Sequence, residues 1–192
     1  MTRSKAKGTA AETAVCAFLR TAGFPYAERL ALQGNKDRGD VTGIPGVVLE
    51  VKAEQIYSFS SWLAEARVER ENAGADFGIV VAKPRMVGVT RTGEWMAIMR
   101  LEDYARLIDQ AGVQDGEVWV QNMSGASIST YIANSMKLAA CHAVQARNDW
   151  WIVRIPPRGV KDQNMYYAVT CLSQVSGLLV RAGYGRGSNG DS

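Results

Sequence analysis

Two acidic residues and a lysine stand close together in the first third of the chain. Asp40 precedes a short turn at residues 42–46, and Glu50 and Lys52 follow that turn. In an extended strand alternate side chains share a face, so Glu50 and Lys52 point the same way and Val51 points the other way. Asp40, on the strand before the turn, can reach the same patch. The spacing therefore predicts two carboxylates and one ammonium group gathered at one end of a sheet.

Such a group of side chains can support metal-assisted chemistry at a phosphate. Mg²⁺ binds carboxylate oxygens, usually one or two of them, and completes its shell with water and substrate phosphate. The metal ion polarises the phosphate and stabilises the negative charge that develops there. Lys52 can hold or deprotonate the attacking water and offset the phosphate charge. The alternative is an ordinary Glu/Lys pair on a surface strand, because the pattern Glu-x-Lys is common in proteins.

A third carboxylate, Glu12, is expected on the apolar side of the first helix. Val15 and Leu19 follow it at helical spacing, and a carboxylate on that stripe needs a partner or a metal ion. A local explanation also exists, since Thr9-x-x-Glu12 has the form of a capping box, which places the glutamate in the first turn of a helix. The two roles are compatible, so Glu12 is a candidate metal or water ligand.

Hydrophobic periodicity predicts the elements that must position these residues. Helices are expected at residues 8–22, 58–73 and 101–111, and strands at 24–32, 40–41, 47–53, 77–82 and 94–100. The resulting order, α-β-β-β-α-β-β-α, predicts an α/β fold in which helices cover the faces of a sheet.

The second part of the chain has the pattern of a degenerate repeat of the first. Four short segments recur in the same order, at 58–64 and 127–133, 76–80 and 149–153, 84–85 and 157–158, and 101–112 and 172–183. Glu50-Val51-Lys52 then falls on Trp119-Val120-Gln121, so the copy lacks the acid and the lysine. We expect residues 117–183 to superpose on 48–112. The chain thus divides into residues 1–112, a repeat at 113–185 and a flexible Gly/Ser tail at 186–192.

Composition excludes several other chemistries. The three cysteines, Cys16, Cys141 and Cys171, form no C-x-x-C pair, so we interpret them as core residues in a reducing compartment rather than as zinc ligands. The single histidine, His142, is expected in a helix core, so a Ser-His-Asp triad is not expected. The net charge is only +3, so contact with nucleic acid would depend on local patches. No apolar run reaches the ~18 residues that would span a membrane.

In order and type, the candidate residues resemble the PD-(D/E)XK nuclease superfamily. Lys7-Gly8 and Glu12 in a first helix, then Gly39-Asp40, then Glu50-Val51-Lys52 carry the resemblance, which covers about residues 5–112. Within the superfamily, the nearest likeness is to archaeal-type Holliday junction resolvases and related proteins of bacterial viruses. Residues 34–40 and 43–46 are particularly similar to the viral group.

The resemblance implies a restriction-endonuclease-like mixed sheet flanked by helices, with residues 1–112 as the nuclease domain. It implies an endonuclease that uses Mg²⁺, or Mn²⁺ in its place, to cut branched DNA in recombination or repair. Asp40 and Glu50 would bind the metal ion, Glu12 would be an additional ligand, and Lys52 would position the nucleophilic water. The setting would be the cytoplasm, of a host cell if the protein is viral. The chain departs from the family at Gly39, where proline is frequent, and at Thr13, where many resolvases have arginine.

DNA is the partner that the resemblance implies. Five basic residues near the candidate site are expected to contact DNA phosphates, namely Arg3, Lys5, Lys7, Lys36 and Arg38. Resolvases of this kind act as symmetric dimers, so we expect a homodimer, or an intramolecular pseudo-dimer in which the inactive repeat replaces the partner. Two alternatives are another DNA nuclease of this fold, of repair or restriction type, and a catalytically silent DNA-binding protein.

Overall fold

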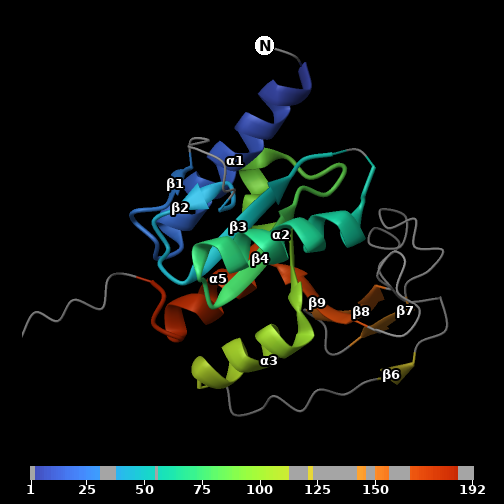
Figure 1. The fold of residues 1–192 in the computed structure, drawn as a ribbon. Coiled ribbons are helices and arrows are strands. Elements are labelled where there is room, and N and C mark those ends of the chain that lie inside the picture. The colour runs from blue at the N-terminus through green and yellow to red at the C-terminus, as the bar shows by residue number, and fades with distance from the viewer. Residues whose placement is uncertain are drawn as a thin grey trace, which may run out of the picture.

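Short strands, most of them joined as hairpins, build one mixed sheet with helices on both faces. The computed structural model describes residues 3–30, 38–54, 56–112, 121–122, 142–145, 150–155 and 165–185. Over these residues the strands form a nine-stranded sheet in the order β1-β2-β3-β4-β5-β9-β8-β7-β6 (Figure 1). The α/β fold with a mixed sheet flanked by helices is therefore confirmed.

The bounds of the elements follow the chain from the N-terminus. The helices are α1 (Arg3–Thr21), α2 (Phe59–Ala73), α3 (Leu101–Gln110) and α5 (Leu172–Arg181), with a 3-10 helix η1 (Val89–Glu94). The strands are β1 (Glu28–Arg29), β2 (Val41–Thr42), β3 (Val47–Lys52), β4 (Phe77–Ala82), β5 (Met96–Arg100), β6 (Gln121–Asn122), β7 (His142–Gln145), β8 (Trp150–Ile155) and β9 (Met165–Cys171). Strands β3 and β4 are parallel and α2 connects them, as a crossover requires.

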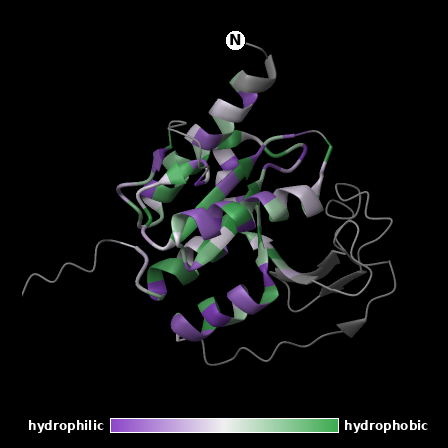
Figure 2. Ribbon diagram, viewed as in Figure 1, coloured by the Kyte–Doolittle hydropathy of each residue, from purple (hydrophilic) through white to green (hydrophobic). Residues whose placement is uncertain are grey.

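Alternating side chains divide the core between the two faces of the sheet. On one face Val47, Leu49 and Val51 of β3 pack in a hydrophobic cluster with residues of α1, α3 and α5. On the other face a smaller cluster joins α2 to β4, β5 and β9, with Trp62 and Ile98 among its members. Figure 2 shows the hydrophobic residues along the central strands. Glu50 and Lys52 have the opposite parity to Val51, which places them on the face that α2 covers.

Two glycines bring the chain preceding β3 into place. Gly43 has a φ of 85°, and a Cβ there would lie 1.8 Å from the carbonyl oxygen of Tyr26. Gly39 has a φ of 90°, and its Cβ would lie 2.8 Å from Cγ1 of Val48. Only glycine fits such close, left-handed positions without strain. These two turns allow Asp40 to lie directly against β3.

The structure corrects four local predictions. Helix α1 begins at Arg3, so Thr9 lies inside the helix and the capping box around Glu12 is wrong. The expected strand at 24–32 is reduced to the two residues of β1, and η1 occupies the start of the strand expected at 94–100. His142 lies in strand β7 and not in a helix.

The C-terminal elements extend the same sheet. Strands β8 and β9 are antiparallel and lead directly into α5, as β4 and β5 lead into α3. The correspondence does not extend to β7, because the expected alignment places its residues near the end of helix α2. Leu172, Val175 and Leu179 of α5 belong to the same cluster as the core of residues 3–112. The expected tail at 186–192 and the segment 127–133 lie outside the described residues. No described helix combines the length and apolar character needed to cross a bilayer.

Candidate active site

Glu50 and Lys52 lie at the carboxyl end of β3, beneath α2. Glu50 is only 7 % exposed. Nζ of Lys52 lies 2.5 Å from Oε1 of Glu50 and 2.7 Å from Oε2 of Glu65 on α2. The lysine therefore bridges a strand carboxylate and a helix carboxylate, and its ammonium group is held at the site.

The backbone of β3 fixes Asp40 beside this pair. The amide of Asp40 donates to the carbonyl oxygen of Leu49 at 2.9 Å. In return, the amide of Val51 donates to Oδ2 of Asp40 at 2.7 Å. The Glu50 carboxyl group lies close enough to Asp40 to raise the pKa of that residue. The structure thus brings Asp40, Glu50 and Lys52 together, as their spacing predicts.

The two carboxyl groups are difficult to ionise together. Burial and the neighbouring Glu50 carboxylate raise the pKa of Asp40 to about 7, although the hydrogen bond from Val51 opposes the shift. Burial also raises the pKa of Glu50 to about 7, against the effect of Lys52. Such a pair titrates as a unit and retains a proton near neutral pH. Burial lowers the pKa of Lys52, but its hydrogen bonds to Glu50 and Glu65 outweigh this and raise it above the usual value.

Glu12 lies near the site but has a partner of its own. Its Oε2 lies 2.5 Å from Nη2 of Arg29 and accepts a second hydrogen bond from Nε of Arg29 at 2.8 Å. It is close enough to Asp40 for its charge to contribute to the raised pKa of that residue. Because Glu12 is not part of a capping box, its ion pair with Arg29 accounts for a carboxylate at this position of α1.

Two further acidic residues, which local spacing does not predict, reach the site from α2. Glu65 pairs with Lys52, and Glu69 is only 4 % exposed and lies close enough to Glu50 to help raise the pKa of that residue. The sequence contains a signal for Glu69, because it follows Ala66 and Trp62 by three and seven residues on the buried stripe of the helix. The sequence does not show which strand residues this stripe of α2 covers, because that depends on tertiary packing.

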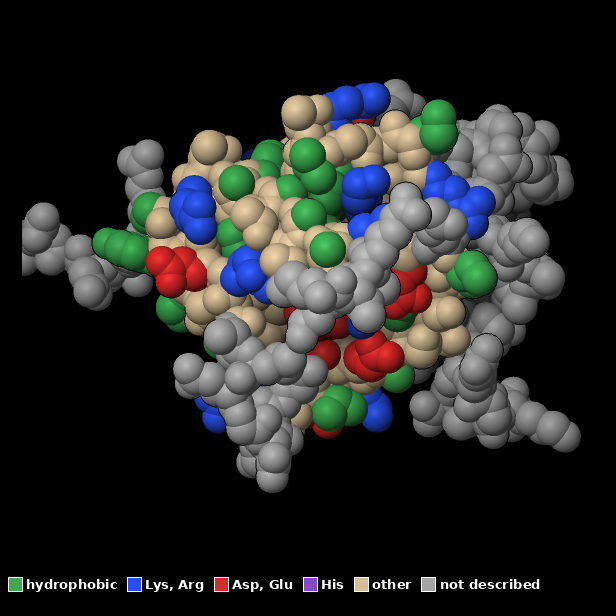
Figure 3. All heavy atoms as spheres, turned by 90° about the horizontal axis from the view of Figure 1, so that it is seen from above, with side chains coloured by type: hydrophobic (Ala, Val, Ile, Leu, Met, Phe, Trp, Pro, Cys, Tyr) green, Lys and Arg blue, Asp and Glu red, His purple; other side chains and the backbone are tan. Residues whose placement is uncertain are grey.

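The expected DNA-contacting residues are dispersed. Lys7 lines a pocket between α1 and the loop after β4, and Arg38 lines a separate hollow formed with residues 41–48. Arg3 and Lys5 belong to α1, whereas Lys36 lies outside the described residues. Figure 3, which views the molecule from above, shows lysine and arginine side chains around a smaller group of acidic ones.

The donor set suits a divalent cation held by two carboxylates. Among the described residues, no group of three or more histidine, cysteine or acidic side chains is arranged to hold a metal ion. Asp40 and Glu50 provide adjacent oxygens that repel each other when ionised, and a cation between them would relieve that repulsion. The residues therefore fit a two-carboxylate magnesium site with water and phosphate, and Glu12, paired with Arg29, lies near it.

Comparison with known proteins finds no match among protein-family models, curated proteins or solved structures. The function is therefore argued from the geometry of the site together with the resemblance of its motifs.

Proposed function

We propose that this protein is a divalent-cation-dependent DNA endonuclease of the PD-(D/E)XK type that cuts branched DNA, such as four-way junctions. The observation that carries the proposal is the convergence of Asp40, Glu50 and Lys52 at the carboxyl end of β3, with Asp40 bonded to the backbone of that strand. The order and types of these residues, which resemble the motif, and their contacts support the proposal.

Each residue has a distinct role in the proposed reaction. Asp40 and Glu50 would hold Mg²⁺, which supplies polarisation of the scissile phosphate and stabilisation of its developing charge when bound. Lys52 is already protonated through its contacts with Glu50 and Glu65. Its part is to orient the attacking water and to offset phosphate charge, and not to remove a proton. Glu65 and Glu69 position the lysine and Glu50 from the side of α2.

The restriction-endonuclease-like fold and the degenerate repeat belong to the same proposal. Antiparallel β1, β2 and β3, followed by the crossover helix α2 and parallel β4, support the fold. Strand β5 pairs with β9 so that Ile98 lies opposite Val169, and the proposed repeat aligns these two residues with each other. Pairing about equivalent residues is what a two-fold dimer interface produces, so we interpret the chain as a fused pseudo-dimer with one live half.

Cleavage assays on three substrates test the proposal. The full chain with Mg²⁺ is incubated with a four-way junction, a flap and a linear duplex of matched sequence. We expect cleavage close to the branch point, abolished by chelation, with little cutting of the linear duplex. Equal cleavage rates on all three substrates would indicate a nuclease without preference for branched DNA. If none of them is cleaved, the nuclease proposal is wrong.

A further inference from the structure

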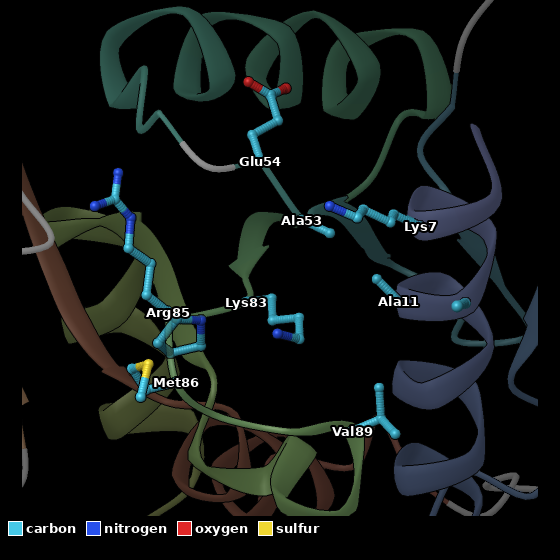
Figure 4. A pocket seen from close by; sticks show the side chains of 10 residues that line it. Lys7, Ala11, Ala53, Glu54, Lys83, Arg85, Met86 and Val89 are labelled. Carbon is cyan, nitrogen blue, oxygen red and sulfur yellow. The ribbon is translucent and has the colours of Figure 1, made fainter. Parts of the chain in front are cut away.

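A pocket of about 600 Å³ opens at the carboxyl ends of β3 and β4, next to the strand end that carries Lys52, although Asp40, Glu50 and Lys52 do not line it. Its walls are the N-terminal part of α1, the two residues after β3 and the segment at 83–89 between β4 and η1. Lys7, Lys83 and Val89 project into the opening from three sides (Figure 4). Pockets of this size accept small molecules or single units of a polymer.

The pocket is built to attract an anion. Lys7, Lys83 and Arg85 line it together with one acid, Glu54, whose carboxylate is directed toward α2 (Figure 4). Lys83 is fixed to the active-site strand, because its amide donates to the carbonyl oxygen of Lys52 at 2.8 Å. The cationic pocket is thus coupled through the backbone to the residue that the proposed reaction uses.

The rim of the pocket is apolar and strained. Met86 is 94 % exposed and has a φ of 65°, a left-handed conformation that costs a non-glycine residue on the order of 1–3 kcal/mol. Val89, also on the rim, is 52 % exposed. Core packing accounts for neither side chain. Lysines and apolar side chains that line one pocket suit a ligand that has both a phosphate and a flat apolar surface, as a nucleotide has.

We propose that this pocket receives an unpaired nucleotide of the DNA strand that adjoins the cleavage site. Its phosphate lies against Lys7 and Lys83, and its base lies against Met86 and Val89. The inference rests on the proposed function, because the branch point of the substrate is where unpaired or easily unstacked nucleotides occur. It adds a binding subsite that selects for branched DNA.

Binding of a fluorescein-labelled oligothymidylate of about ten nucleotides, measured by anisotropy in chelator, tests this subsite without cleavage. The variant Lys7→Ala/Lys83→Ala is expected to bind roughly tenfold more weakly. Its plot of log affinity against log salt concentration should become shallower by about 0.7 for each phosphate that the protein no longer neutralises. Glycine adopts the left-handed backbone of Met86 without strain, so Met86→Gly should remove only the side chain. We expect this variant to bind oligothymidylate about threefold more weakly and to bind an abasic chain of equal length as before. Arg181→Ala, at the end of α5, removes a cation elsewhere and should leave binding unchanged.

Each outcome separates this subsite from the nuclease proposal. Unchanged affinity in the double-lysine variant overturns the subsite, and Asp40-dependent cleavage would then still support the nuclease. Displacement of the oligonucleotide by an equal concentration of free thymidine monophosphate also overturns it, since the pocket would then be a mononucleotide site. Equal weakening on thymidylate and abasic chains in Met86→Gly would contradict the base contact. If the protein binds the oligonucleotide but cleaves none of the substrates, the nuclease proposal is wrong and the proposal of a nucleotide-binding pocket stands.

Discussion

Asp40 and Glu50 occupy positions where each makes the other harder to ionise. Their pKa values of about 7 mean that the folded protein keeps protons that the unfolded chain releases near pH 4. A group whose pKa is raised on folding stabilises the protein below its unfolded pKa, and that stability is lost as the pH rises through its folded pKa. Without a divalent cation, these two residues therefore make the protein less stable between about pH 4 and pH 7.

The substitution Asp40→Asn isolates this effect. The amide oxygen can still accept the hydrogen bond from Val51, but the charge is gone. At pH 8 we expect the variant to be more stable than the natural protein by on the order of 2–3 kcal/mol, and the difference should vanish near pH 4. Thermal unfolding across this pH range, with and without Mg²⁺, measures it. Mg²⁺ should stabilise only the natural protein at pH 8, and equal stabilisation of both would contradict a metal site at Asp40.

Glu65 provides a second test at the level of single residues. It is half exposed, and its contact at the site is with Lys52. Because Glu50 alone can still hold the lysine, Glu65→Gln should reduce the cleavage rate about tenfold, with little loss of stability. Glu71→Gln, also exposed on α2, is the matched control. Single-turnover cleavage rates of both variants measure the effect, and equal rates for both would show that Glu65 has no positioning role.

At the scale of elements, the turn that carries Asp40 matters as much as its side chain. At Gly39 a methyl group would meet the backbone oxygen of Leu49 at 3.0 Å, whereas at Gly112, also at positive φ, it would meet nothing within 4 Å. Gly39→Ala should thus cost about 1–3 kcal/mol of unfolding free energy, and Gly112→Ala about 1 kcal/mol. Because the substitution Gly39→Ala should displace Asp40, we also expect this variant to cleave DNA more slowly, on the order of a hundredfold. Chemical denaturation and cleavage rates measure both effects. Equal rates for the two folded variants would show that the turn does not position Asp40.

The elements also show how far the sequence alone could lead. Helices α2 and α3 and strand β4 agree with prediction within about a residue, because clear periodicity and a following polar or glycine residue define each of them. Helix α1 begins early because Arg3 to Lys7 contain good helix formers that hydrophobic periodicity does not detect. The sequence predicts a helix at His142, where the structure has a strand, because an apolar run without a period fits both. Asp40, Glu50 and Lys52 follow from local spacing, whereas Glu69 depends on how α2 lies against β3.

At the scale of the whole molecule, β9 already covers the edge of β5 where a second copy of the chain would pair. The proposed pseudo-dimer therefore predicts a monomer with one active site. Sedimentation should show a single chain, and a plasmid bearing a cruciform should first become a nicked circle. A dimer, or direct conversion to linear DNA without a nicked intermediate, would contradict this arrangement and favour paired active sites.

The central claim is that Asp40, Glu50 and Lys52 form a metal-dependent nuclease site. The most direct measurement is the single-turnover rate of four-way-junction cleavage in Mg²⁺ by the natural chain and by Asp40→Asn, Glu50→Gln and Lys52→Ala, with Glu71→Gln as control. We predict that each of the first three variants cleaves at least about a hundredfold more slowly while junction binding is retained, and that the control cleaves at the natural rate. Cleavage that persists unchanged in Asp40→Asn or Lys52→Ala would contradict this claim.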